Sequence, residues 1–249
     1  MSPTRLFGIV RSLAIYYGQP FKTWRARRFY AEFVGAGDLA FDIGAHAGNR
    51  VGHWLALGAR VVAVEPQPDF VTILRWLYGR RDDVIIEPVG VAATPGHGRL
   101  LISRATPTVS TFSADFVAGV SPTERWAGVR WDDHIQVSLT TLDALIEHHG
   151  LPRFIKIDVE GLEDEVLNGL STPVEGLSFE AMSETQDRAI ACVDRLEALG
   201  RYQYRFSAAE SLKWHHDRWL DADAIRAELA SLKPVDGSGD VYARLDARL

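Results

Sequence analysis

The alternation of apolar runs along this chain constrains its fold more than any other feature. From residue 38 onward, short β-rich runs such as Leu39–Ile43 and Arg60–Val64 alternate with segments, such as 70–77, whose apolar residues recur at helical spacing. Strands that alternate with helices form a parallel sheet covered by helices. The sequence therefore predicts an α/β fold.

The later part of the chain continues this pattern. Val84–Ile86 and Val89–Val91 are predicted to form a third extended stretch that is bent at Pro88. Further strands are predicted over Leu100–Ile102, Phe154–Val159, Leu177–Met182, Tyr202–Phe206 and Val241–Leu245. The sequences Thr140-Thr141-Leu142-Asp143 and Ser183-Glu184-Thr185-Gln186 resemble capping boxes, which predicts a helix start at both places. A Trp-rich helical connection is expected between the last two strands. No repeat or linker divides the sequence, so residues 1–249 are predicted to form a single domain.

Two segments depart from the alternation. Residues 1–35 hold an apolar stretch too short to span a bilayer, followed by several basic residues, and are interpreted as a helical extension. Such a segment most often packs on its own domain or on a second subunit of a homodimer, and contact with a membrane surface is the less favoured alternative. Residues 104–136 are polar and aperiodic, which predicts a lid or acceptor loop. The aromatic residues that could cover an acceptor, or simply anchor this loop, are Phe112, Phe116, Trp126 and Trp131.

Composition excludes several classes of function. The net charge of -6 argues against a nucleic-acid partner, because such proteins normally present a basic face to phosphate. The single cysteine, Cys192, rules out an intramolecular disulfide and is expected to be buried. The pairs His148–His149 and His215–His216 lack metal-ligand spacing to carboxylates and are interpreted as surface residues, so no metal ligand is assigned to them. A cytoplasmic location is expected, since no signal-peptide pattern is present.

The turn after the first predicted strand is the most informative motif. It reads Asp42-Ile43-Gly44-Ala45-His46-Ala47-Gly48, and Glu65-Pro66 follows at the end of the second strand. Glycines at a strand-to-helix turn let a ligand approach the backbone, and an acidic residue about twenty positions later can accept hydrogen bonds from ribose hydroxyls. Without a ligand, Asp42 would be a helix cap and Glu65 a solvated strand end. Their joint spacing favours a nucleotide-type cofactor site.

The charge of Asp42 distinguishes between two cofactors. A dinucleotide places a pyrophosphate over this turn, and a carboxylate there would repel it by on the order of a kcal/mol. S-adenosylmethionine carries an ammonium and a sulfonium and no phosphate, so the same carboxylate attracts it. The sequence therefore favours S-adenosylmethionine over a nicotinamide dinucleotide.

Three motifs together resemble the FkbM-type methyltransferases. They are Phe41-Asp42-Ile43-Gly44-Ala45-His46, Val62-Ala63-Val64-Glu65-Pro66-Gln67-Pro68 and Phe154-Ile155-Lys156-Ile157-Asp158-Val159-Glu160-Gly161. Two weaker matches to the family pattern are Thr141-Leu142-Asp143 and the stretch Gly239-Asp240-Val241-Tyr242-Ala243-Arg244. The resemblance covers roughly residues 38 to 245, while residues 1–35 and 104–136 match nothing in the family pattern.

The resemblance implies a Rossmann-like class I methyltransferase fold. Its seven-stranded sheet is mostly parallel with an antiparallel last strand, its cofactor is S-adenosylmethionine, and its members commonly methylate a hydroxyl oxygen. The expected cofactor-binding residues are Asp42, Gly44, Ala45, His46, Gly48, Glu65 and Pro66. The acceptor is expected to be a small molecule, sugar or glycan, because family membership leaves the acceptor-binding loops variable.

The end of the predicted strand 154–159 supplies the candidate catalytic residues. Ligands of open α/β sheets sit beyond the carboxyl ends of the strands, which places Asp158 and Glu160 near the methyl group. Asp158 is the first candidate, as a base or as an orienter of acceptor and cofactor, and Glu160 is the second. The two carboxylates could alternatively hold a divalent metal, although no further ligand can be named. Lys156 is interpreted as a salt-bridge partner that holds a carboxylate.

Two other classes of function remain open from the sequence. One is a nicotinamide-dependent oxidoreductase, which Asp42 disfavours. The other is a non-catalytic domain that keeps the fold without the reaction, which the presence of Asp42, Glu65 and Asp158 disfavours.

Overall fold

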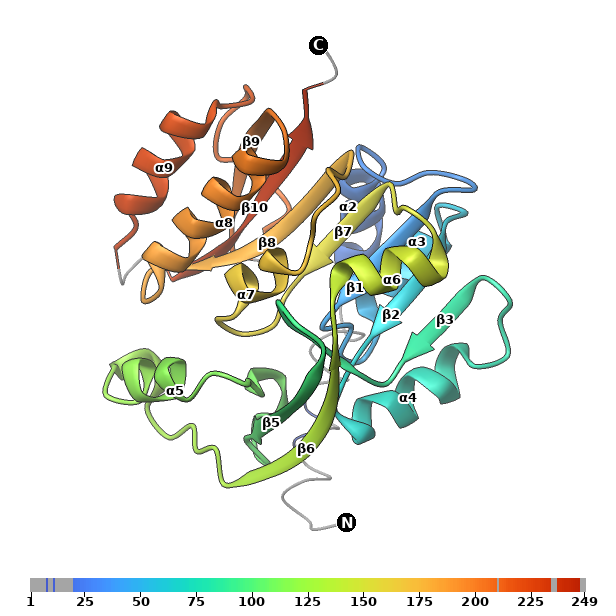
Figure 1. Cartoon of the computed structure of the whole chain (residues 1–249), viewed down its shortest axis with the longest axis vertical. Coiled ribbons are helices and arrows are strands. Elements are labelled where there is room, and N and C mark those ends of the chain that lie inside the picture. The colour runs from blue at the N-terminus through green and yellow to red at the C-terminus, as the bar shows by residue number, and fades with distance from the viewer. Residues whose placement is uncertain (1–7, 9–10, 12–19, 210, 234–236, 247–249) are drawn as a thin grey trace.

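A seven-stranded sheet forms the centre of the computed structural model, which describes residues 8, 11, 20–209, 211–233 and 237–246 (Figure 1). The strand order is β3-β2-β1-β7-β8-β10-β9. The strands are β1 Leu39–Ile43, β2 Arg60–Val64, β3 Val84–Glu87, β7 Phe154–Ile157, β8 Gly176–Met182, β9 Tyr202–Ala208 and β10 Ser238–Leu245. All neighbours pair in parallel except that β10 runs antiparallel to both β8 and β9. The predicted mostly parallel sheet with an antiparallel last strand is confirmed.

Helices cover both faces of this sheet. They are α2 Pro20–Tyr30, α3 Asn49–Leu55, α4 Pro68–Tyr78, α6 Leu142–His149, α7 Glu163–Asn168, α8 Gln186–Leu199 and α9 Ala222–Ala230. One more helix, α5 Ala114–Val120, packs in a separate cluster. Successive side chains of a strand point to opposite faces. Phe41 and Ile43 accordingly pack in one core with α6, α7, α8 and α9, while Ala40 packs in the other with α2, α3 and α4.

A second, three-stranded sheet was not expected from the sequence. Its order is β4-β6-β5, with β4 Gly90–Val91, β5 Gly96–Ile102 and β6 Asp133–Thr140. The stretch 84–91 is therefore two strands in different sheets, separated at Pro88. The expectation that regular structure returns only at Thr140 is wrong as well, because β6 precedes it. Ile135, Val137 and Leu139 alternate with polar residues along β6, a strand pattern that the interpretation of residues 104–136 as a loop overlooked.

The predicted helix starts had mixed outcomes. Thr141 caps α6, since its hydroxyl accepts from the Ala144 amide at 3.1 Å. The capping box at Ser183 is wrong: α8 begins after Thr185 without a side-chain cap, and the Ser183 hydroxyl donates to Glu184 instead. The predicted strand 154–159 ends at Ile157.

The connection between β9 and β10 also differs from the prediction. Its tryptophans, Trp214 and Trp219, lie in the irregular segment before α9, and no tryptophan lies within the helix. They pack against Phe33, Tyr242 and the Arg205 guanidinium, which lies 5.1 Å from the centre of each indole ring. Cys192 is fully buried on α8, as predicted.

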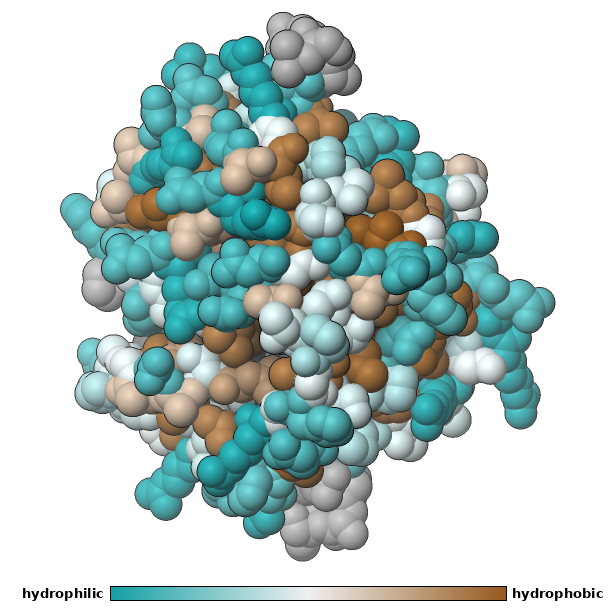
Figure 2. Space-filling view, viewed as in Figure 1, coloured by the Kyte–Doolittle hydropathy of each residue, from teal (hydrophilic) through white to brown (hydrophobic). Residues whose placement is uncertain are grey.

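Much of the predicted extension 1–35 lies outside the described residues. Its described part from residue 20 onward begins with α2. Across the described ranges, no helix combines the length and the apolar character needed to cross a bilayer. Figure 2 shows polar residues over most of the face seen in Figure 1, with hydrophobic residues in separate patches between them.

Candidate active site

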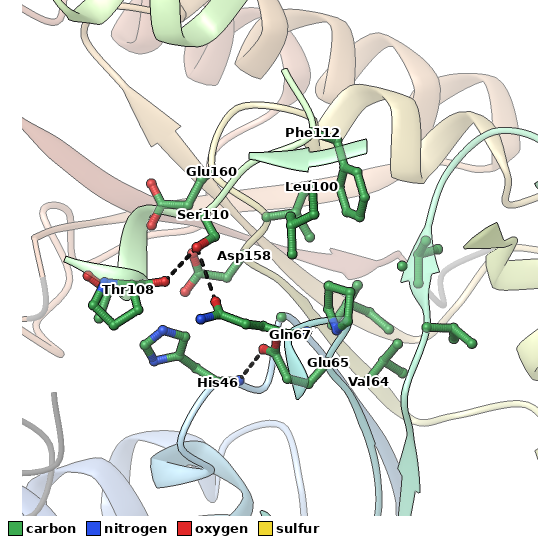
Figure 3. A pocket seen from close by; sticks show the side chains of 18 residues that line it. His46, Val64, Glu65, Gln67, Leu100, Thr108, Ser110, Phe112, Asp158 and Glu160 are labelled. Carbon is green, nitrogen blue, oxygen red and sulfur yellow. Dashed lines mark hydrogen bonds between the residues drawn. The ribbon is translucent and has the colours of Figure 1, made fainter. Parts of the chain in front are cut away.

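A pocket lies at the carboxyl ends of β1, β2 and β7, where the motifs of the sequence meet. It encloses about 500 Å³ of space that is open to solvent. Of the predicted site residues, Gly44, His46, Glu65, Pro66, Asp158 and Glu160 line it. Figure 3 shows the side chains of His46, Gln67, Ser110 and Asp158 converging on the pocket from different elements. Residues far apart in the chain thus share one cavity.

The other end of the pocket is apolar and comes from the second sheet. It is lined by Val89, Gly90, Val91, Leu100 and Phe112. The Phe112 ring packs closely on Gly90, because a Cβ atom at that glycine would lie 2.8 Å from the ring. Only a residue without a side chain allows this contact, so the flat apolar wall depends on Gly90.

Glu65 is held rigidly at the middle of the pocket. Its two carboxylate oxygens accept from the backbone amides of His46, at 2.8 Å, and Gln67, at 2.7 Å. The side chain is buried, and this burial raises its pKa to about 7. Each oxygen keeps a second lone pair, so the carboxylate can still accept from a pair of ligand hydroxyls.

The first turn reaches the pocket through Gly44 and His46, while Ala45 and Gly48 lie beneath it. Gly44 has a φ of +81°, and a Cβ atom there would lie 1.9 Å from the Asp158 carbonyl oxygen. Ala45 is fully buried and donates its amide to Val64. Gly48, also at positive φ, is the N-cap of α3. Ala45 and Gly48 therefore shape the turn without lining the pocket.

His46 faces the pocket as a neutral imidazole. Its ring packs on Phe70, with the centres 3.8 Å apart. Burial, with a smaller contribution from the Arg50 charge, lowers the pKa of His46 to about 4. The ring is therefore uncharged at neutral pH and interacts only weakly with an anionic ligand group.

Arg50, which the sequence analysis missed, connects the first turn to the end of β7. Its Nε donates to Asp42 Oδ1 at 2.9 Å, its Nη1 to Asp158 Oδ2 at 2.7 Å, and its Nη2 to the Gly44 carbonyl at 2.9 Å. No spacing rule links an arginine at the start of a helix to an aspartate eight residues earlier. The sequence offered one signal that could have identified Arg50: it is a basic residue in the first turn of a helix, where the helix dipole disfavours positive charge.

This ion pair changes the charge argument drawn from the sequence. Asp42 is fully buried and does not cap a helix, and Arg50 balances its charge. Asp42 is not among the residues that line the pocket. In the described part of the chain, no Lys or Arg lines the pocket either. Negative charge reaches the pocket from Asp158 and Glu160 instead. A cationic ligand is thus favoured by these carboxylates rather than by Asp42.

Asp158 is held between two cations. Although burial opposes ionisation, the Lys156 ammonium and the Arg50 guanidinium lower the pKa of Asp158 below its ordinary value. Lys156 is almost fully buried, and its Nζ lies 2.7 Å from Asp240 Oδ1 and 3.9 Å from Asp158 Oδ2. The interpretation of Lys156 as a salt-bridge partner is confirmed. Asp158 is therefore a well-oriented, ionised and weakly basic carboxylate.

β8 brings a third carboxylate, Glu180, near the two catalytic candidates, which lie in the loop after β7. One oxygen from each of Asp158, Glu160 and Glu180 lies within 4.8 Å of the other two. Glu163 shapes the loop, because its Oε1 accepts from the amides of Val159 and Gly161 at 3.1 and 3.2 Å. Glu180 thus supplies the third carboxylate that the metal alternative lacked in the sequence.

His148, His215 and His216 are exposed, as interpreted, but His149 is not, and both pairs lie near a carboxylate that the sequence spacing did not indicate. His149 Nε2 lies 3.0 Å from Glu87 Oε1, and the His149 side chain is only 5% exposed. His215 Nδ1 and His216 Nε2 both contact the Glu228 carboxylate, at 2.5 and 3.2 Å. The carboxylate near each pair belongs to a different element of the fold, so sequence spacing could not reveal the contact.

The segment 104–136 is more ordered than its sequence suggested. It contains two short 3₁₀ helices, Pro107–Val109 and Glu124–Trp126, and the helix α5. Phe116, Trp126 and Trp131 pack on one another with ring centres 5.3 to 6.4 Å apart. These three aromatic residues anchor the segment, while its residues 107–112 contribute to the pocket wall.

A family comparison identifies the type of enzyme. The model of the methyltransferase FkbM domain matches residues 42–206, which is more than half of the chain. The chain belongs to this family. It is therefore an S-adenosylmethionine-dependent methyltransferase, with the Rossmann-like fold that the strand order displays. Among curated proteins, no relative matches the sequence.

Solved structures of methyltransferases share only a distant likeness with this one. Precorrin-6y C5,15-methyltransferase from Geobacter metallireducens is 10% identical, with 89% of this chain and 87% of that chain covered and a TM-score of 0.45. An rRNA methylase from Streptococcus thermophilus is also 10% identical, covering 89% and 95%, with a TM-score of 0.46. Aeropyrum pernix fibrillarin with bound S-adenosyl-L-methionine is 11% identical, covering 88% and 76%, with a TM-score of 0.46. These likenesses are too weak to inform the acceptor.

Proposed function

We propose that this enzyme methylates a hydroxyl oxygen of a small molecule, sugar or glycan. The proposal rests on one observation: Asp158, an oriented carboxylate, lines the same pocket as Glu65. A group that can bind ribose and a group that can meet an acceptor hydroxyl are thus held in one cavity. S-adenosylmethionine, when bound, supplies an electrophilic methyl group on a sulfonium.

Each part of the pocket fits one part of this cofactor. Glu65 is suited to accept from both ribose hydroxyls, because its oxygens are already fixed by backbone amides. The apolar wall around Gly90 and Phe112 suits an adenine ring. Gly44 and Asp158, at the opposite end, would then border the amino-acid tail and the methyl group.

Asp158 contributes chiefly by orientation. Its lowered pKa makes it a weak base, so it accepts a hydrogen bond from the acceptor hydroxyl and aligns its oxygen with the methyl carbon. Glu160, which also lines the pocket, is the second carboxylate available to take the proton as the carbon–oxygen bond forms. Alignment and proton removal are thus assigned to neighbouring residues.

The charge of the site supports a neutral acceptor. Carboxylates line the pocket without a Lys or Arg among its described lining residues, and the whole chain carries a net charge of -6. A phosphate backbone would be repelled by this surface. Neutral polyols and sugars meet no such barrier, and their hydroxyls can donate to carboxylates.

Calorimetric titration and a methyl-transfer assay test the proposal. S-adenosylhomocysteine should bind and NADH should not. Labelled methyl groups should transfer to hydroxylated small molecules or saccharides in an acceptor panel, with an ether product by mass spectrometry. Asp158→Asn should lower turnover by at least about 100-fold while S-adenosylhomocysteine affinity stays within about tenfold. The surface variant Asp83→Asn serves as a matched control. Full activity of Asp158→Asn, or methylation on nitrogen or carbon, would contradict the proposal.

A further inference from the structure

Arg50 stands out as a buried cation beside a pocket that otherwise offers negative charge. Its side chain is 13% exposed, and two of its partners, Gly44 and Asp158, line the pocket. Arg50 is not itself a lining residue, but its guanidinium lies within 2.7 to 2.9 Å of these two lining residues. Neither the family match nor the motifs assign a role to this residue.

A cofactor with an amino-acid tail brings both an ammonium and a carboxylate to this end. The ammonium finds acceptors in the Gly44 carbonyl and Asp158. The carboxylate needs a cation, because Asp158 and Glu160 would otherwise repel it. His46 cannot fill this role well, since its imidazole is neutral at physiological pH.

The donor geometry of Arg50 matches that need. A guanidinium has five N–H groups, and the bonds to Asp42, Asp158 and Gly44 use one hydrogen on each nitrogen. One hydrogen on each terminal nitrogen is left over, so the guanidinium can donate to a further anionic acceptor, and a carboxylate is the acceptor that suits it best. Asp42 holds the guanidinium in place from behind through Nε. Lys156, the neighbouring buried cation, is instead engaged with Asp240 at 2.7 Å.

We propose that the Arg50 guanidinium binds the carboxylate of the cofactor's amino-acid tail, an assignment that rests on the proposed placement of S-adenosylmethionine in this pocket. Arg50 is thus a binding residue, and the buried Asp42 is the positioning residue that orients it. This gives Asp42 a function in cofactor binding without direct contact.

The test compares two ligands that differ only in the carboxylate. One is S-adenosylhomocysteine, and the other is its decarboxylated analogue, which keeps the nucleoside and the ammonium. Wild-type protein should bind the analogue at least about tenfold more weakly, the loss expected for one charge-assisted contact. Arg50→Gln should weaken binding of S-adenosylhomocysteine by a similar factor and leave binding of the analogue within about threefold, so that the two affinities converge.

Two further variants keep the test decisive. Arg50→Gln leaves Asp42 buried without its cation and could unfold the protein, so the double variant Asp42→Asn/Arg50→Gln removes both charges together. Arg81→Gln, at an exposed ion pair with Asp83, is the matched control and should leave the ratio of the two affinities unchanged.

The outcomes separate this inference from the proposed function. Equal binding of both ligands by the wild type, or an equal loss for both in the Arg50 variants, would overturn the role of Arg50 while the methyltransferase site stands. Binding of neither ligand by the wild type would overturn the placement of the cofactor itself, and the role of Arg50 with it.

Discussion

Gly44, in the turn after β1, has no room for a side chain. Gly44→Ala would place a Cβ atom 1.9 Å from the Asp158 carbonyl at a φ of +81°, so the turn must shift away from β7. We expect a loss of about 2 kcal/mol or more in the free energy of unfolding, and loss of S-adenosylhomocysteine binding. Urea unfolding and calorimetry measure both. Gly96→Ala, where a Cβ atom meets nothing within 4 Å, should change neither.

A single buried carboxyl should make stability depend on pH. Burial raises the pKa of Glu163 to about 7, so the folded protein holds a proton that the unfolded chain releases near pH 4.5. The stability that Glu163 contributes is therefore complete below about pH 4.5 and is lost as the pH rises to about 7. The full shift corresponds to about 3 kcal/mol.

Glu163→Gln tests this directly, because an amide oxygen can still accept from Val159 and Gly161. Urea unfolding between pH 5 and 8 should show a smaller decline for this variant than for the wild type. Some decline remains, since burial raises the pKa of Glu65 to about 7 as well. Glu175→Gln, at a side chain that is 61% exposed, should follow the wild-type curve. Parallel curves for Glu163→Gln and wild type would contradict the assignment.

At this scale the sequence predicted which residues meet in the pocket better than it predicted their contacts. Gly44, Glu65 and Asp158 could be chosen because turn and strand-end positions follow from strand order. Arg50 and Glu180 could not, since their partners are set by how α3 and β8 pack, and no local pattern encodes that. The same reason explains why the carboxylate partners of the histidine pairs were missed.

Among the elements, the segment between β5 and β6 links stability to cofactor binding. Trp126 is buried in its aromatic cluster, and residues 107–112 of the same segment line the pocket. Trp126→Ala should cost about 3 kcal/mol in the free energy of unfolding and weaken S-adenosylhomocysteine binding, because the pocket wall loses its anchor. Chemical denaturation and calorimetry provide the readouts. Trp24→Ala, at a side chain that is 67% exposed, should leave both unchanged.

The parallel strands of the central sheet were predictable because buried parallel strands are short and mostly apolar, as in residues 61–64 of β2. The second sheet was not, although strands were predicted at the positions of β4 and β5, because β6, the strand that joins them, lies at the end of the segment interpreted as a loop. The predicted Ser183 box failed for a different reason: the Ser183 hydroxyl is engaged with Glu184, and the helix begins only at Gln186, the last residue of the box.

For the whole molecule, net charge should decide which macromolecules the enzyme avoids. With a charge of -6 and an acidic pocket, it should not retard tRNA or an rRNA fragment in a gel-shift assay at about 150 mM salt. The same preparation should bind S-adenosylhomocysteine, which shows that the protein is folded. RNA binding that weakens steeply as salt is raised would instead indicate a basic groove and a nucleic-acid acceptor.

The chain leaves the central sheet after β3 and returns before β7, and the two ends of this excursion are tied together. Gly90 pairs with Leu139, Val91 pairs with Thr140, and the Ala92 amide donates to the Thr140 carbonyl at 2.9 Å. Farther along the excursion, the Ser110 hydroxyl donates to Gln67 after β2 at 3.1 Å, and the Thr111 hydroxyl donates to the Glu160 carbonyl after β7 at 2.8 Å. The excursion is therefore fixed at three separate points, so the pocket wall that it carries is braced against the main sheet.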